Sequence, residues 1–146
     1  MIKNAGDRLE YLCDTIPVLL TNIDDHSFSE KVKPEKWSKK EIIGHLIDSA
    51  TNNHQRFVRV QFEDKPNIVY DQNKWNSYNF YQQIERQQII NFWTVYNRQL
   101  LELIRRIPNE NLARVCLIGE KVLTLEFIIN DYVEHLEHHL RQVVSY

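Results

Sequence analysis

The sequence predicts an all-α protein, a four-helix bundle that forms one domain over residues 1–146. Four long segments repeat apolar residues every three or four positions, which is the spacing of one helix face. Glycine, proline and Asn/Asp clusters fall mainly between these segments, where loops are expected. The 146 residues are 42% hydrophobic and include only three glycines, which is enough for one buried core and too little to argue for two.

The first two helices are predicted from an apolar repeat and from a capping signal. The first covers about residues 2–23, and Pro17 inside it predicts a kink or a local break, because proline has no backbone N–H to donate. The second begins at Ser38, since Ser38 and Glu41 have the spacing of a capping box. It is expected to end near Phe62.

A long connection separates these two helices from the second half of the chain. Residues 64–79 are polar and aromatic and longer than most bundle loops, so they form either a functional segment or a packed surface loop. The third helix is predicted over about residues 80–107. A short extended hairpin is expected near residues 114–122, and Thr124 then caps a last helix that runs to about Val144.

Charge and composition exclude several classes of function. The formal net charge is −2 and no block of like charges occurs, so no basic surface for nucleic acid is expected. No window approaches the roughly 20 apolar residues of a membrane span, and no secretion signal is recognisable, so a cytoplasmic protein is expected. Cys13 and Cys116 lie far apart in no metal-binding spacing, and both are expected to be idle or buried thiols.

The last predicted helix carries three histidines within five residues. His135 and His139 are four residues apart, which stacks two imidazoles on one helix face. On a helical wheel both fall at the edge of the apolar stripe, whereas His138 points to solvent. Two adjacent imidazoles are a good start for a divalent metal site, which then needs a third ligand from elsewhere.

The second predicted helix also carries histidines, and its pattern leaves their roles open. Its apolar face contains His54, so periodicity alone would bury His54. His45 lies nearly opposite that face and heads a polar stripe with Ser49, Asn52 and Arg56. Such a stripe either lines a cleft between helices or makes ordinary interhelical and surface hydrogen bonds.

Three stretches together resemble the DinB-like superfamily of bacterial four-helix proteins. They are residues 37–48, with the pattern W-S-x-x-E-x-x-x-H-L-x-D, then residues 71–75, and residues 131–139, which end in H-x-x-H-H. The resemblance covers roughly residues 30–145. Each motif is weak alone, and their order and separation make them fairly specific together.

The resemblance implies a site, a cofactor and an oligomeric state. By position, His45, His135 and His139 would bind one divalent metal ion, often zinc or nickel, with one position left for water or substrate. Many members of the family look like homodimers, so the resemblance implies a homodimer here. Some relatives are transferases or isomerases that depend on a low-molecular-weight thiol, and a small-molecule substrate is therefore expected here.

Two carboxylates and four further residues are candidates for supporting roles. Asp131 precedes His135 by four residues and Asp48 follows His45 by three, so each is placed to hold a ring N–H, although both are also compatible with ordinary helix charge. The candidates for substrate contact are, in chain order, Asn52, Arg56, Trp75 and Tyr78. The first two extend the polar stripe, and the two aromatic residues are placed to close a pocket or to join the core.

Three functions are compatible with these residues. The leading hypothesis is a metal-dependent enzyme that transfers a small thiol to an electrophile, because a metal ion held by three neutral nitrogens promotes thiolate formation. A hydrolase that uses metal-bound water is the alternative, and the need for an added thiol separates the two. The third is a non-catalytic, stress-related bundle in which a metal ion only stabilises the fold or the site stays empty.

Overall fold

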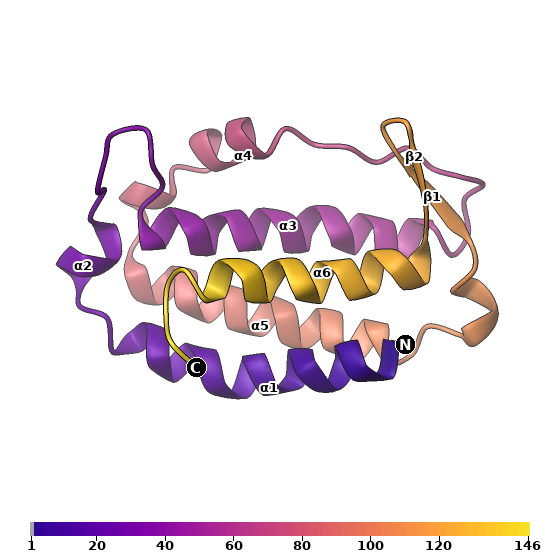
Figure 1. The fold of residues 1–146 in the computed structure, drawn as a ribbon, viewed down its shortest axis with the longest axis horizontal. Helices are drawn as coiled ribbons and strands as arrows, with labels where there is room; N and C mark the ends of the chain where they lie inside the picture. The colour runs from indigo at the N-terminus through magenta and orange to yellow at the C-terminus, as the bar shows by residue number, and fades with distance from the viewer. Residues whose placement is uncertain (1) are drawn as a thin grey trace.

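The computed structural model describes residues 2–146, and its main body is a bundle of four helices (Figure 1). These helices are α1 (Ile2–Thr21), α3 (Lys39–Arg59), α5 (Arg86–Ile104) and α6 (Leu125–Leu140). Both α1 and α3 pack against α5 and α6, so α1 and α3 lie diagonally across the bundle. The predicted all-α fold is confirmed.

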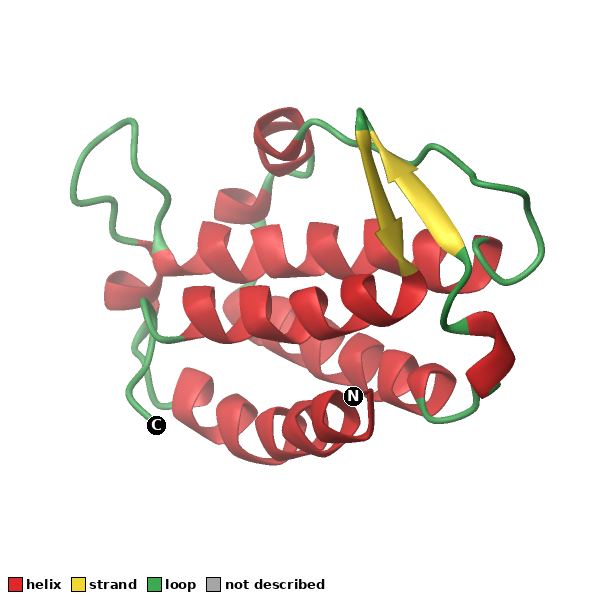
Figure 2. Ribbon diagram, turned by 45° about the vertical axis from the view of Figure 1, so that its right-hand side comes forward, coloured by secondary structure: helices red, strands yellow, loops and turns green. Residues whose placement is uncertain are grey.

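Smaller elements cover the outside of the bundle. Two short helices, α2 (Asp25–Ser29) and α4 (Gln72–Tyr78), contact α3, as Figure 1 shows for α4 along the outer side of that helix. Strands β1 (Val115–Ile118) and β2 (Lys121–Thr124) form the expected antiparallel hairpin just before α6 (Figure 2). Its turn uses Gly119 at a φ of 65°, a conformation that residues with a Cβ rarely adopt.

Capping signals located the starts of two helices correctly. The Ser38 hydroxyl accepts a hydrogen bond from the Glu41 N–H, and the Glu41 carboxylate accepts one from the Ser38 N–H, which completes the predicted capping box. Thr124 accepts from the N–H of Phe127 and begins α6. Both helices end three or four residues earlier than predicted, at Arg59 and Leu140.

The connection before α5 differs most from the prediction. The third helix was expected from Phe80, but Phe80 has a left-handed φ of 56° and Glu85 caps α5, which begins at Arg86. A 3-10 turn, η1 (Tyr81–Gln83), occupies the gap, and α4 upstream is capped by the Asp71 carboxylate. Apolar periodicity missed these short elements because neither is long enough to repeat.

Helix α1 continues through Pro17, so the local break, one of the two predicted outcomes, does not occur. Proline cannot donate to the carbonyl four residues earlier, which belongs to Cys13. The guanidinium of Arg98 on α5 donates to that carbonyl instead, at 3.2 Å. A tertiary hydrogen bond therefore replaces the missing helical one.

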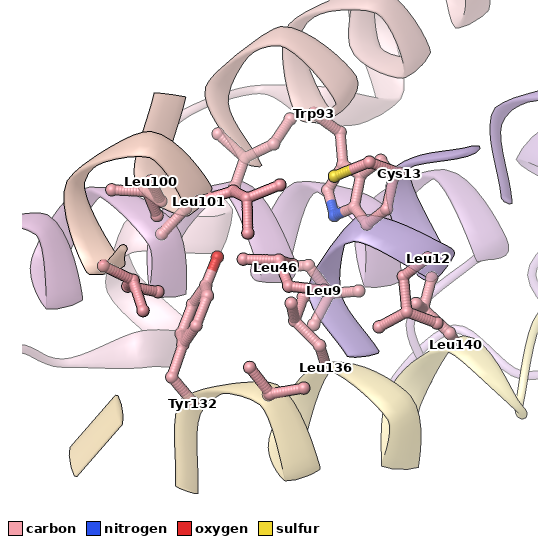
Figure 3. Close-up of a cluster of buried hydrophobic side chains, with 14 of the residues drawn as sticks. Leu9, Leu12, Cys13, Leu46, Trp93, Leu100, Leu101, Tyr132, Leu136 and Leu140 are labelled. Atoms are coloured by element: carbon pink, nitrogen blue, oxygen red, sulfur yellow. The ribbon is translucent and has the colours of Figure 1, made fainter. Parts of the chain in front are cut away.

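The interior of the bundle is closely packed with aliphatic and aromatic side chains, as the close-up in Figure 3 shows. Trp93 of α5 and Tyr132 of α6 are fully buried beside leucines from all four helices. The Tyr132 hydroxyl donates to the Asn97 side chain at 2.6 Å, which satisfies both buried groups. Among residues 2–146 no helix combines the length and apolar character that a membrane span requires.

Candidate metal centre

The structure brings His45, His135 and His139 together between α3 and α6. One nitrogen from each ring lies within 4.8 Å of the other two, and this is the one such cluster of His, Cys, Asp or Glu among residues 2–146. The Nε2 atoms of His45 and His135 are 3.2 Å apart. His138, which the wheel placed in solvent, is exposed. Two segments that are 90 residues apart thus supply one constellation.

His45 is buried, contrary to what the helical wheel predicted. Only 1% of it is exposed, because rings from α6 and from the segment before α3 pack against it, those of His135, His139 and Trp37. The Trp37 ring covers the imidazole, with ring centroids 4.8 Å apart. The wheel failed here because it records only apolar periodicity, whereas His45 is covered by two other imidazoles and by a tryptophan outside the long helices. His54, which the wheel buried, is half-buried and bonds the Tyr96 hydroxyl through Nδ1 at 2.8 Å.

Burial keeps two of the imidazoles neutral. Loss of hydration, followed by repulsion from the His135 and His139 rings, lowers the pKa of His45 to about 3. Loss of hydration also lowers the pKa of His135 to about 4. At neutral pH both rings therefore offer a lone pair rather than a positive charge, which is the form that binds a metal.

A side chain that sequence reasoning missed orients the third imidazole. Nδ1 of His139 lies 3.0 Å from the amide oxygen of Gln142. A proton donated to that oxygen fixes the tautomer and leaves the Nε2 lone pair free. The sequence offered one signal for this contact: Gln142 follows His139 by three residues, and residues at that spacing share a face of the predicted helix. Nδ1 of His45, in contrast, is buried without any partner.

Asp48 does not hold the ring of His45, which corrects the expected role of this carboxylate. Its Oδ1 accepts hydrogen bonds from the Tyr81 hydroxyl at 2.5 Å and from the Asn79 side-chain amide at 2.9 Å. Burial raises the pKa of Asp48 to about 6. Both donors come from the segment between α4 and α5, and that segment could not be placed from periodicity.

Gly44 explains how Tyr81 reaches Asp48. A Cβ on Gly44 would lie 2.2 Å from the Tyr81 ring, far inside van der Waals contact. The ring therefore rests directly on the backbone of α3, one residue before His45. Only glycine permits this approach without displacing the ring.

A cavity of about 120 Å³ adjoins the histidines on the α6 side of α3 and is lined by Arg56, Asp131 and His135 among others. Arg56 is 8% exposed, and its guanidinium donates to the Ile68 carbonyl and to the Asn53 side chain. Residues 2–146 include no carboxylate within ion-pair distance of it. Asp131 lies close enough for its charge to raise the pKa of His135 in part.

The other proposed substrate contacts lie away from the imidazoles. Asn52 is buried, and its amide donates to the backbone carbonyl of Asp48 at 2.9 Å. Trp75 and Tyr78 are on α4 and line cavities on the opposite flank of α3, without any histidine. These two aromatic residues therefore do not close the cavity beside His135.

The three imidazoles fit a divalent metal ion. Zinc bonds imidazole nitrogen at about 2.0–2.1 Å, which in a tetrahedral site places two nitrogens roughly 3.3 Å apart. The observed Nε2 separation of 3.2 Å between His45 and His135 agrees with this value. The nitrogens of all three rings lie within 4.8 Å of one another, so binding of one ion by the three would draw them closer. Three neutral ligands with a fourth position open are the pattern of catalytic rather than structural zinc sites.

Comparison with known sequences identifies related proteins. The family described as the DinB superfamily matches residues 8–143 of this chain. YfiT of Bacillus subtilis (strain 168) is 20% identical over 150 residues, an alignment that covers 98% of this chain and 84% of YfiT.

Comparison with solved structures finds the same fold. The structure of YfiT, described as a probable metal-dependent hydrolase with an unusual four-helix bundle topology, matches with a TM-score of 0.88 and 19% identity over 97% of this chain and 83% of that one. A mycothiol-dependent maleylpyruvate isomerase matches with a TM-score of 0.81 and 11% identity, over 99% of this chain and 61% of the isomerase. At these identities the two structures establish the fold alone.

Proposed function

Because the chain belongs to the DinB superfamily and its fold brings three imidazoles to one point, we propose that it is a metal-dependent enzyme. His45, His135 and His139 would hold one divalent ion, and zinc and nickel are metals that suit imidazole nitrogen. The observation that carries this proposal is the cluster itself, with one nitrogen of each ring within 4.8 Å of the others.

The ligand set defines the chemistry of the site. A divalent ion held by three neutral nitrogens keeps its full charge and would lower the pKa of a thiol or a water molecule at its open position toward neutrality. The protein contributes by keeping His45 and His135 unprotonated through burial. Gln142 contributes by fixing the tautomer of His139.

Substrate would bind on the α6 flank of α3. Arg56 presents a buried positive charge to the cavity that it shares with His135, so an anionic group such as a carboxylate is favoured there. Ser49 and Tyr70 line the same cavity and can add hydrogen bonds from their hydroxyls. Asp131 would act as a positioning residue, since its negative charge lies near His135 and would favour a metal cation bound to that ring.

Transfer of a small thiol to an electrophile is the first reaction to test. Support comes from Arg56, which has no carboxylate at ion-pair distance and suits the carboxylates of low-molecular-weight thiols, and from the mycothiol dependence in the name of the structurally similar isomerase. Hydrolysis is the second, because YfiT is described as a probable metal-dependent hydrolase. Turnover that requires an added thiol would favour transfer, and turnover without one would favour hydrolysis.

Metal analysis tests the site independently of any reaction. Protein purified without chelator is expected to contain close to one equivalent of a divalent metal, by elemental analysis. His45→Ala and His139→Ala should each lose it, whereas His138→Ala, which alters an exposed ring of the same helix, should retain it. Full occupancy in the first two variants would contradict the proposed ligands.

A further inference from the structure

A second and larger cavity lies on the opposite flank of α3, between that helix, α4 and α5. Its volume is about 350 Å³, which is within the range of small-molecule sites, and no histidine lines it. Asp48 and Ile89 are buried among its lining residues, and Asn79 and Phe92 are exposed. The cavity therefore opens to solvent above a buried carboxylate.

The carboxylate of Asp48 is only half satisfied. Its Oδ1 accepts from Tyr81 and Asn79, but its Oδ2 is buried and has no hydrogen-bond partner. Both donors to Oδ1 are neutral, and within residues 2–146 no basic group lies at ion-pair distance from Asp48. A buried oxygen in this state is costly unless something donates to it.

The remaining lining of the cavity is largely apolar. Isoleucines and three aromatic rings, those of Trp75, Tyr81 and Phe92, surround the carboxylate. An apolar lining with one convergent charged group is typical of sites that orient an amphipathic small molecule. Aromatic faces also attract cations, which adds to the effect of the carboxylate.

We propose that this cavity binds a small organic amine, with its ammonium group donating to Oδ2 of Asp48 and its apolar body against Trp75 and Phe92. The ammonium group would provide both the missing donor and the missing positive charge. The site goes beyond the proposed metal chemistry, because none of its residues belongs to the three-histidine cluster.

The three tryptophans of the chain allow the site to be located by NMR without any substitution. Trp75 lines the cavity, Trp37 covers His45, and Trp93 is buried in the core. With benzylamine as the probe, the indole N–H resonance of Trp75 is expected to shift and saturate, while those of Trp37 and Trp93 stay in place. A saturable shift at Trp37 alone, or no saturable shift at all, would overturn the proposal.

Substitution of the carboxylate tests its role. Asp48→Asn should weaken benzylamine binding by about tenfold or more in calorimetry, since a hydrogen bond between charged groups is replaced by a neutral one. Asp131→Asn, which alters a carboxylate on the other flank of α3, should bind as the unmodified protein does. The metal content of Asp48→Asn should be unchanged, which separates this result from a failure of the metal centre.

Neutral and anionic probes keep the test decisive if Asp48→Asn does not fold. Benzyl alcohol has nearly the shape of benzylamine without its charge, and benzoate has the opposite charge. The unmodified protein should prefer the amine to the alcohol by about tenfold or more and should bind benzoate least. Equal affinity of the unmodified protein for amine and alcohol would refute an ammonium site. So would an Asp48→Asn variant that binds the amine as tightly as the unmodified protein does.

Discussion

Helices α1 and α3 have nearly the same length and lie across the bundle from each other, but they bury different chemistry. Helix α1 buries seven residues, and none carries a charged, amide, hydroxyl or imidazole side chain. Helix α3 buries thirteen, and seven of them are polar, among them His45, Asp48 and Arg56. The buried side chains of α1 are apolar or thiol groups that contribute to the core, and those of α3 also include the groups that can bind a metal and small molecules.

The difference follows from what covers each helix. Helix α1 packs mainly against α5 and α6, so its outer side stays in water and its pattern is simply amphipathic. Helix α3 is covered in addition by α2, α4 and η1, and its Asp48 accepts a hydrogen bond from Tyr81 of η1. Buried polar groups are costly unless they are paired, so Oδ2 of Asp48, which has no partner and belongs to a residue that lines a cavity, marks a place where a ligand is expected.

Among the substitutions, the largest effect is expected from truncation of the apolar face of α1. Leu12→Ala should lower the free energy of unfolding by about 2–5 kcal/mol, because Leu12 is fully buried and its loss leaves a cavity. Urea denaturation measures this change. Val18→Ala on the same helix, where the side chain is 63% exposed, should change stability by no more than about 0.5 kcal/mol. Equal effects of the two changes would contradict the assigned face of α1.

A glycine on each helix provides a matched pair. Gly44→Ala should destabilise the protein by about 1–3 kcal/mol, because the new Cβ would lie 2.2 Å from the Tyr81 ring and must displace it. Gly6→Ala on α1 meets no atom closer than 3.9 Å and should stabilise by up to about 1 kcal/mol, since alanine favours the helix. Thermal and urea unfolding would show opposite signs. A neutral Gly44→Ala would mean that Tyr81 does not rest on α3.

The imidazoles of the cluster should make metal-free protein sensitive to acid. In the unfolded state both imidazoles bind a proton near pH 6.5. In the folded state the pKa is about 3 for His45 and about 4 for His135. Stability present above pH 6.5 is therefore lost as pH falls toward 4, by at most about 1.4 kcal/mol per pH unit for each ring. Urea denaturation from pH 7 to pH 4 measures the slope.

Two variants separate this effect from general acid denaturation. His45→Gln should flatten the loss of stability between pH 6.5 and pH 4, because one proton-binding group of the unfolded state is removed. His138→Ala should leave the slope nearly unchanged, since that ring is exposed in the folded protein. A slope that His45→Gln does not alter would count against the low pKa of His45.

The smallest effect is expected at the proline of α1. Arg98→Ala should cost about 0.5–1.5 kcal/mol, because the Cys13 carbonyl loses its donor. The cost should shrink when Pro17→Ala is also present, since an alanine N–H can then bond that carbonyl within the helix. A double-mutant cycle by urea denaturation gives the coupling. Strict additivity would show that Arg98 does not replace the missing helical bond.

The sequence alone was sufficient for features that depend on neighbours along the chain. The four long helices, the cap at Ser38, the cap at Thr124 and the hairpin before α6 all rest on local hydrogen bonds and on apolar repeats. The pairing of His135 with His139 rests on helical spacing in the same way. His45 was assigned to the same cluster from a family resemblance, because its own helix pattern pointed away from the core.

Contacts between distant segments were decided only by the tertiary structure. The turn of Asp48 toward Tyr81 and the cover of α3 by α4 depend on a connection that has no periodicity to read. The burial of His45 depends on Trp37 and on rings from α6. Apolar repeats record which face meets the main core, and they carry no information about a second layer that packs on polar groups. For this chain, the sequence therefore determined the long helices and the pairing of His135 with His139 on the last of them. Packing around α3 decided which of its polar groups are buried and which of these have no partner.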